Sequence, residues 1–147
     1  MTAVERLRWW DIPALLPIEE DLFGPEKWSA GMFWNELANG HYYRVVRGPD
    51  GGVDGYGGLA VVPPDEAWVQ NIAVRRDVQR GGIGTALLRD LLGEAARRGI
   101  PRVLLEVAVD NAPAQKLYAR HGFEGIGVRK GYYQPSNTDA LVMLRED

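Results

Sequence analysis

Cysteine is absent from the 147-residue chain, and histidine occurs only twice. Without cysteine there can be no disulfide, no thiolate metal site and no acyl-cysteine intermediate. The two histidines, His41 and His121, are far apart in the sequence and lack the close spacing of histidine metal motifs. The sequence therefore predicts neither a catalytic metal nor a reaction that passes through a cysteine nucleophile.

Long apolar runs and an excess of positive charge are also lacking. No segment approaches the ~20 apolar residues that a membrane span needs, and residues Met1 to Trp10 are charged rather than signal-like. The formal net charge is -3, whereas proteins that track nucleic-acid phosphates usually have a basic face and a high pI. We expect a cytoplasmic protein with no membrane or nucleic-acid partner, whose partners are neutral or cationic.

The residues that are present favour a single globular domain. Hydrophobic residues make up 46% of the chain and charged residues 25%, within the usual range for a domain with one core. Five Trp, six Tyr and three Phe supply large apolar side chains for that core. We therefore expect residues 1–147 to form one domain.

Apolar periodicity and turn residues predict an α+β fold. The strongest helix signal is a broad apolar face that begins near Gly82 and ends before Gly99. Three β-rich runs ahead of it, joined by turns rich in glycine and proline, predict an antiparallel meander. Together these patterns predict a mixed, mostly antiparallel central sheet with helices on both faces. Strands are expected at 4–9, 42–47, 56–62, 67–74, 103–109, 123–128 and 140–144, and helices at 11–18, 27–37, 82–98 and 112–120.

The segment 79–85, Gln-Arg-Gly-Gly-Ile-Gly-Thr, joins the predicted strand that ends at Val74 to the strong helix. Glycines let a backbone approach a ligand closely, and a helix N-terminus carries about half a positive charge, so this loop suits a pyrophosphate. The third glycine of a dinucleotide-binding loop is missing after Gly84, and the chain has no GxxxxGK segment. These absences weaken the dinucleotide and nucleoside triphosphate alternatives, while a plain tight turn remains the alternative without a ligand.

Two motifs resemble those of GCN5-related N-acetyltransferases. Residues 79–84 resemble the Q/R-x-x-G-x-G/A motif of this family, and residues 117–123, Leu-Tyr-Ala-Arg-His-Gly-Phe, resemble its LYxxxGF motif. Both occur in the family's order, with Ile-Ala-Val at 72–74 ahead of them. The resemblance covers the whole chain and implies the fold of this family and acetyl transfer from acetyl-CoA to a primary amine.

A finer resemblance concerns the acceptor. Several segments resemble the bacterial members of the family that acetylate the amino-terminal alanine of ribosomal protein S18. This resemblance implies that the acceptor is a protein N-terminus. The segments are 71–74, 105–107, Asn111, 129–133 and 139–143.

The resemblance also implies which residues hold acetyl-CoA. Backbone groups of the strand end contact the pantetheine, and those of the glycine loop contact the pyrophosphate. Asn111 either touches the same molecule or only caps the helix that follows it. The implied residues are Ile72, Ala73, Val74, Arg80, Gly81, Gly82, Ile83, Gly84, Thr85 and Asn111.

Candidate catalytic residues come from two predicted elements. Glu106 lies in a strand with apolar neighbours on both sides, where a carboxylate is uncommon. We expect it to act as general base on the amine, directly or through water, and the alternative is a salt-bridged glutamate at the rim of a cleft. The resemblance implies that Tyr118 protonates the departing thiolate, and the alternative is an aromatic side chain of the core.

Three further features have two interpretations each. The resemblance suggests that Tyr132 and Tyr133 line the acceptor channel, although they could be ordinary strand aromatics. The acidic run Glu19-Glu20-Asp21 is interpreted as a solvated face, and the alternative is electrostatic guidance of an arginine-rich peptide terminus.

The leading hypothesis is direct acetyl transfer within a ternary complex, which the absence of cysteine favours. One alternative keeps the fold and acetylates small amines or antibiotics. Another is a non-catalytic module that senses CoA.

Overall fold

The computed structural model describes residues 3–146 and contains seven strands and four α-helices. Short 3-10 turns lie at Trp9–Asp11, Gly24–Glu26 and Arg76–Val78. The helices are α1 (Ile12–Phe23), α2 (Ala30–Ala38), α3 (Ile83–Arg97) and α4 (Ala112–Arg120). The strands are β1 (Val4–Arg6), β2 (Tyr42–Arg47), β3 (Val53–Val62), β4 (Glu66–Val74), β5 (Arg102–Ala108), β6 (Glu124–Tyr133) and β7 (Thr138–Glu146).

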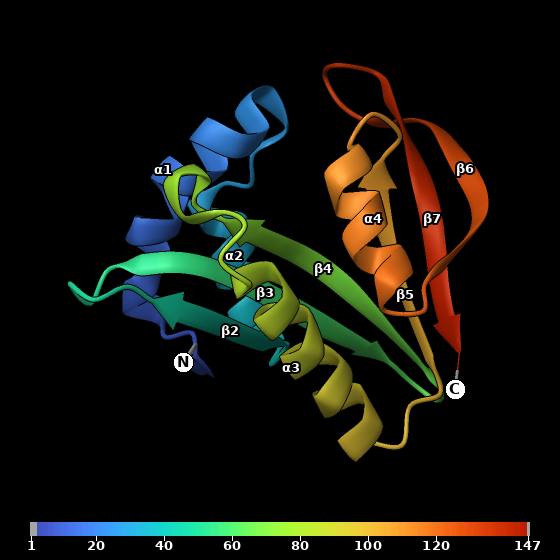
Figure 1. The fold of residues 1–147 in the computed structure, drawn as a ribbon, viewed down its shortest axis with the longest axis horizontal. Helices are drawn as coiled ribbons and strands as arrows, with labels where there is room; N and C mark the ends of the chain where they lie inside the picture. Colours follow the sequence, from blue (N-terminus) through green and yellow to red (C-terminus); the bar gives the residue numbers. More distant parts are fainter. Residues whose placement is uncertain (1–2, 147) are drawn as a thin grey trace.

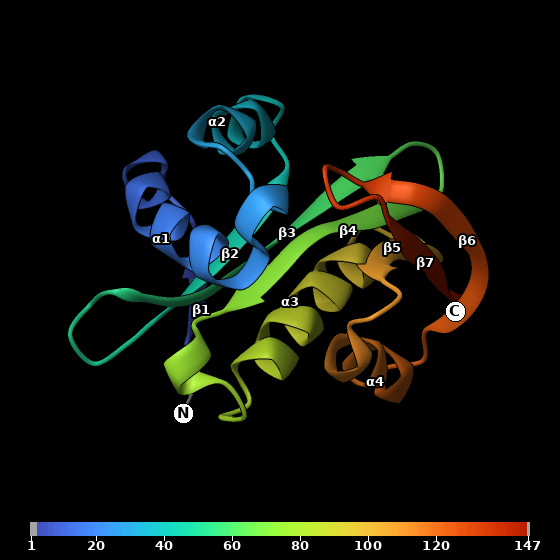
Figure 2. The same cartoon turned by 90° about the horizontal axis from the view of Figure 1, so that it is seen from above.

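All seven strands form one sheet in the order β1-β2-β3-β4-β5-β7-β6. Among the described strands only the β4–β5 pair is parallel, because α3 crosses over between these two strands. Helices α1 and α2 cover one face of the sheet, and α3 and α4 cover the other (Figures 1 and 2). The predicted α+β fold, with a mostly antiparallel sheet between two layers of helices, is confirmed.

Two apolar clusters fill the two faces of the sheet. One includes Leu91 of α3 and Tyr118 of α4, and the other includes Leu15 of α1 and Phe33 of α2. The periodic apolar face that predicted α3 points into the first cluster, so burial of that face holds the helix against the sheet. Its buried side chains are Leu87, Leu88, Leu91 and Ala95.

Helix α2 begins three residues later than the sequence predicts. Ser29 is its N-cap, and the Ser29 hydroxyl accepts a hydrogen bond from the Met32 N–H (3.2 Å). The Trp28 N–H instead donates to the side chain of Glu19 on α1 (2.7 Å). A tertiary contact therefore sets the start of this helix, and the local pattern of 27–37 could not show it.

Several strands are longer than predicted, β3 and β6 among them. β3 begins at Val53 rather than 56. Glycine is a poor strand former, but Gly55 lies opposite Val46 of β2 and Val74 of β4, and Val53 lies opposite Arg47 of β2. β6 continues past 128 to Tyr133, which lies opposite Thr138 of β7. In both cases pairing with a neighbouring strand overrides weak local propensity.

The sheet opens at its centre. The ladder between β4 and β5 runs from Glu66–Arg102 to Val69–Leu105 and includes no further pairs of described residues. β4 continues to Val74 and β5 to Ala108, so the two strands diverge and leave a gap between the halves of the sheet (Figure 1). Within residues 3–146 no helix is long and apolar enough to cross a membrane.

Candidate active site

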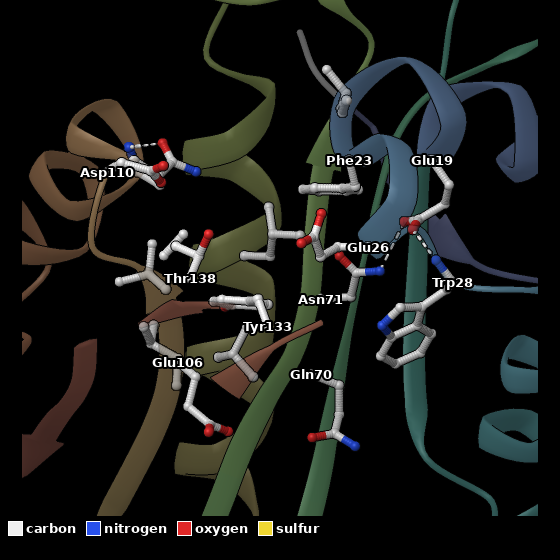
Figure 3. Close-up of a pocket in the computed structure, with 18 of the residues that line it drawn as sticks. Glu19, Phe23, Glu26, Trp28, Gln70, Asn71, Glu106, Asp110, Tyr133 and Thr138 are labelled. Atoms are coloured by element: carbon white, nitrogen blue, oxygen red, sulfur yellow. Dashed lines mark hydrogen bonds between the residues drawn. The ribbon is translucent and has the colours of Figure 1, made fainter. Parts of the chain in front are cut away.

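The divergence of β4 and β5 creates a cleft of about 680 Å³. One wall consists of α1, the turn after it and β4, and the other consists of β5, α4 and the β6–β7 loop (Figure 3). Its charged lining residues are all acidic among those that the structure describes, namely Glu19, Glu26, Glu106 and Asp110. The cleft is therefore suited to a cationic guest.

Glu106 lies on β5 where the ladder to β4 has ended, and its side chain is only 15% exposed. Arg129 Nε lies 3.0 Å from Glu106 Oε2, although its N–H does not point at that oxygen to make a hydrogen bond. The Tyr132 hydroxyl donates a longer hydrogen bond to Oε1 (3.3 Å). Glu106 is thus both salt-bridged and exposed to the cleft, so its two predicted interpretations are compatible.

Tyr118 lies on α4 and lines the same cleft as Glu106. Its ring packs edge-on against Phe123 at a centroid distance of 5.9 Å, and the residue is 8% exposed. Burial raises the pKa of the Tyr118 hydroxyl to about 12, because phenolate is costly in an apolar environment. The hydroxyl makes no hydrogen bond within residues 3–146, and it remains a protonated donor at neutral pH.

The two tyrosines of β6 occupy different positions. Tyr133 lines the cleft, whereas Tyr132 is 45% exposed and reaches the site through its contact with Glu106. Their rings meet edge-on at 5.1 Å. Burial is the main cause that raises the pKa of each, followed for Tyr132 by the neighbouring Glu106 carboxylate.

The glycine loop lies at the N-terminus of α3, outside the lining of the cleft. Gly82 is the N-cap with φ of 85°, a left-handed conformation that favours glycine, and no side chain caps the helix. A Cβ built on Gly82 would meet no described atom within 4 Å, so the backbone there borders open space. A Cβ placed on Gly84, by contrast, would lie 3.5 Å from Leu117 Cδ2 of α4 and 3.7 Å from Val74 Cγ2 of β4.

This geometry fits an anionic group at the start of α3. Arg80 has φ of 71° and is exposed, as are Gly81 and Gly82. The first N–H groups of the helix lack intrahelical partners, and within residues 3–146 no side chain caps them. A pyrophosphate could therefore approach the backbone of 80–85, with Ile83 and Thr85 in the first turn.

The predicted strand-end residues are not equivalent. Ile72 lines the cleft, Ala73 is buried on the opposite side at 3% exposure, and the Val74 side chain packs near Gly84. Asn111 lines the cleft and also caps α4, because its Oδ1 accepts the Ala114 N–H (3.2 Å). The capping role of Asn111 is thus observed, and it does not prevent contact with a ligand.

The interpretation of 19–21 as a solvated face is wrong for Glu19. Glu19 is fully buried, because α1 turns it toward the sheet. Its carboxylate accepts hydrogen bonds from the Tyr56 hydroxyl (2.5 Å), the Asn71 side chain (3.0 Å) and the Trp28 N–H (2.7 Å). Glu20 and Asp21 do face solvent, where each pairs with a cation.

Sequence analysis did not assign several residues of the cleft to the site. Asn71 was part of the resemblance, but its hydrogen bond to Glu19 joins residues 52 positions apart. Glu26 reaches across the cleft, where its Oε1 accepts the Ser136 N–H (3.1 Å) from the opposite wall. The polar pair Gln70-Asn71, flanked by Val69 and Ile72 within a strand, could have pointed to Asn71. The others missed are Glu26, Trp28, Gln70, Asp110, Ser136 and Thr138.

Comparisons with known proteins identify relatives of this chain. The sequence pattern of the acetyltransferase (GNAT) family matches residues 4–123. N-alpha-acetyltransferase RimI of Mycobacterium tuberculosis is 40% identical over 133 residues, which cover 88% of this chain and 82% of that protein. The [ribosomal protein bS18]-alanine N-acetyltransferase of Escherichia coli is 34% identical over 145 residues, covering 97% and 96% of the two chains.

Solved structures show the same fold. The crystal structure of the ribosomal-protein-S18-alanine N-acetyltransferase from Escherichia coli superposes with a TM-score of 0.87 at 33% identity, covering 99% of this chain and 94% of that one. A phosphinothricin acetyltransferase from Sinorhizobium meliloti, solved in complex with AcCoA, has a TM-score of 0.81 at 21% identity, over 99% and 88% of the chains, and shares the fold. The resemblance read from the two motifs is confirmed, and the chain belongs to the GNAT family of acetyltransferases.

Proposed function

We propose that this enzyme transfers the acetyl group of acetyl-CoA to the α-amine of a protein N-terminus, namely the amino-terminal alanine of ribosomal protein S18. The observation that carries the proposal is the acidic cleft between β4 and β5, with Glu106 and Tyr118 in its lining. Two relatives that share a third or more of the sequence support it: the name of one states N-alpha-acetylation, and the name of the other states acetylation of the alanine of ribosomal protein bS18. We further propose that residues 1–147 act as one domain, in the cytoplasm where ribosomal proteins are made.

Acetyl-CoA, when bound, supplies the activated acetyl thioester. We assign its pyrophosphate to the backbone N–H groups of 80–85, where the uncapped helix N-terminus favours negative charge. The pantetheine lies along the free edge of β4 at 72–74, beyond the last β4–β5 pair. Asn111 borders the same gap from the α4 side.

Glu106 takes the proton of the acceptor ammonium, directly or through a water molecule. An α-amine with a pKa near 8 costs only about 1.4 kcal/mol to deprotonate at pH 7, whereas a lysine near 10.4 costs about 4.6 kcal/mol. A carboxylate is a weak base, and a weak base suffices for an α-amine. This difference favours a protein N-terminus over a lysine side chain as the acceptor.

Tyr118 gives its hydroxyl proton to the leaving sulfur. Its pKa of about 12 keeps the proton in place at neutral pH until a thiolate develops nearby. Because the hydroxyl has no competing acceptor in residues 3–146, it can turn toward the cleft.

The acidic walls hold the acceptor segment. Glu26 and Glu106, both in the lining, provide carboxylates for the ammonium and for a basic residue near the N-terminus. Tyr133 in the lining and Tyr132 beside Glu106 provide aromatic surface for the same segment.

Acetylation assays with matched acceptors test the proposal. The purified protein and acetyl-CoA would be mixed with a peptide copying the S18 N-terminus, or with the same peptide carrying a blocked α-amine and a free lysine. We expect rapid acetylation of the first peptide and little of the second. Faster acetylation of polyamines or aminoglycosides would favour the small-amine alternative, and binding of acetyl-CoA without any turnover would favour the non-catalytic module.

Mass spectrometry of ribosomal proteins from cells that lack the gene tests the natural acceptor. We expect S18 to lose its amino-terminal acetyl group. An S18 terminus that stays acetylated in these cells would contradict the assignment of S18 while leaving the acetyltransferase family unaffected.

A further inference from the structure

A second cleft lies near the edge of the sheet that β1 forms. It has a volume of about 530 Å³ and is formed by β1 and the turn after it, the end of α2 and β2. In the sheet, β3 separates β2 from β4, so different strands form the two clefts. The second cleft therefore does not belong to the acetyl-transfer site.

Three tryptophans make this cleft unusual. Trp9, Trp10 and Trp34 all line it and are 57%, 58% and 48% exposed. Trp9 stacks on Trp34 with ring centroids 5.8 Å apart, and Trp10 meets Trp9 edge-on at 5.4 Å. Large apolar side chains gathered on a surface in this way mark an interaction site.

The charge of this cleft is opposite to that of the active site. Arg6, Arg8, Arg44 and Arg98 line it, and no aspartate or glutamate does so among the described residues. Arg44 and Arg98 pair with Asp90 and Glu94. Arg6 and Arg8 have no carboxylate partner within residues 3–146, and the Arg8 guanidinium lies 5.9 Å from the centroid of Trp10.

We infer that this tryptophan–arginine groove binds an acidic segment of a protein partner. Apolar side chains of that segment pack against Trp9, Trp10 and Trp34, and its carboxylates pair with Arg6 and Arg8. Tryptophan and arginine are the residue types that contribute most to protein–protein affinity. Single-stranded nucleic acid also stacks on tryptophan, but it needs an extended basic track, and this chain has a net charge of -3.

Indole N–H resonances test the inference directly. The chain has five tryptophans, of which Trp28 and Trp68 lie outside the groove and serve as internal references. The probe is a short synthetic peptide in which glutamate and aspartate alternate with leucine and proline. We expect it to shift the resonances of Trp9, Trp10 and Trp34 but not the two references, and to bind more weakly as salt is raised.

Charge-reversal variants supply the control. Arg6→Glu combined with Arg8→Glu should weaken peptide binding by about tenfold or more, which corresponds to about 1.4 kcal/mol. Arg89→Glu combined with Arg120→Glu changes two exposed arginines outside the groove by the same charge and should leave binding unchanged. Unshifted Trp28 and Trp68 resonances would show that each variant is folded.

Four outcomes would overturn the inference. The first is an absence of groove shifts with the acidic peptide. The second is equal binding by a lysine-substituted peptide, and the third is a preference for a single-stranded RNA oligonucleotide. Concentration-dependent shifts of the protein alone would also overturn it, because they would make a second copy of this chain the occupant.

Discussion

At the residue scale, Tyr118 shows how burial prepares a side chain for proton transfer. The apolar packing that includes Phe123 leaves the hydroxyl in the lining of the cleft and raises its pKa to about 12. An ordinary tyrosine loses its proton near pH 10. Because the folded-state pKa lies above that value, the protonated form persists across the pH range in which an α-amine becomes a free base.

We expect Tyr118→Phe to lower kcat by about 100-fold or more, the usual contribution of a general acid, while the fold stays intact. In the unchanged enzyme, the rate should show no alkaline fall near pH 10 from ionisation of Tyr118. Steady-state kinetics across pH with acetyl-CoA and the S18 peptide measure both effects. Tyr42→Phe is the matched control, since the Tyr42 hydroxyl bonds to Asp90 away from the active site. A Tyr118→Phe enzyme with normal kcat would remove the assigned acid.

Glu19 shows how the buried surroundings of one side chain affect the stability of the fold. Its removal leaves the buried Tyr56 hydroxyl, the Asn71 amide and the Trp28 N–H without an acceptor. We expect Glu19→Ala to lower the free energy of unfolding by about 3 kcal/mol. Urea denaturation measures this change. Glu20→Ala removes only an exposed ion pair with Lys27, and its cost should stay below about 1 kcal/mol. Equal effects of the two substitutions would contradict the role assigned to Glu19.

At the scale of elements, helix α3 combines two functions in one segment. Its apolar face packs against the sheet, and its uncapped N-terminus faces open space at Gly82. Its other end has a glycine of similar conformation, because Gly99 has φ of 68° and equally open surroundings among the described atoms. The helix therefore contains its own control for a test of the glycine loop.

Gly82→Ala and Gly99→Ala should cost similar stability, about 1 kcal/mol each, since both place a Cβ on a left-handed residue. Only Gly82→Ala should raise the KM for acetyl-CoA, by about tenfold, because its methyl group keeps the backbone away from the pyrophosphate. Thermal unfolding and acetyl-CoA titrations of the two variants separate these effects. Similar KM values in both variants would show that the loop does not hold the pyrophosphate.

At the scale of the whole molecule, the fold presents two clefts of opposite charge. The acidic one lies between β4 and β5, and the tryptophan–arginine groove lies beside β1 and β2. The formal net charge of -3 conceals this separation. Cationic and anionic guests can therefore be attracted to different parts of the same small domain.

The KM for a basic acceptor peptide should rise with ionic strength, because salt screens its attraction to the acidic cleft. Glu26→Gln removes one negative charge from the cleft lining and keeps the shape of the side chain. It should therefore raise that KM at low salt and weaken the dependence of the KM on salt. Asp65→Asn removes an exposed charge that is not in the cleft lining and should have neither effect. Initial rates at several salt concentrations distinguish the two variants. If the KM of the Glu26→Gln enzyme kept the salt dependence of the unchanged enzyme, the result would argue against electrostatic guidance by Glu26.

The amino-acid sequence by itself determined the features that local interactions specify. The period of apolar residues defined α3, and the glycines of 79–85 marked the loop before it, because backbone preferences act over a few residues. The order of strands and helices followed from the same signals, and so did the positions of Glu106 in a strand and of Tyr118 in a helix.

Only the tertiary structure decided which distant residues meet. The buried position of Glu19, its bonds to Tyr56 and Asn71, and the stacking of Trp9 on Trp34 join segments with no shared local pattern. The cleft itself arises because β4 and β5 pair for four residues and then diverge, which depends on both strands and their neighbours at once. Contacts between distant segments are set by packing of the whole chain, and no periodicity within a single segment encodes them.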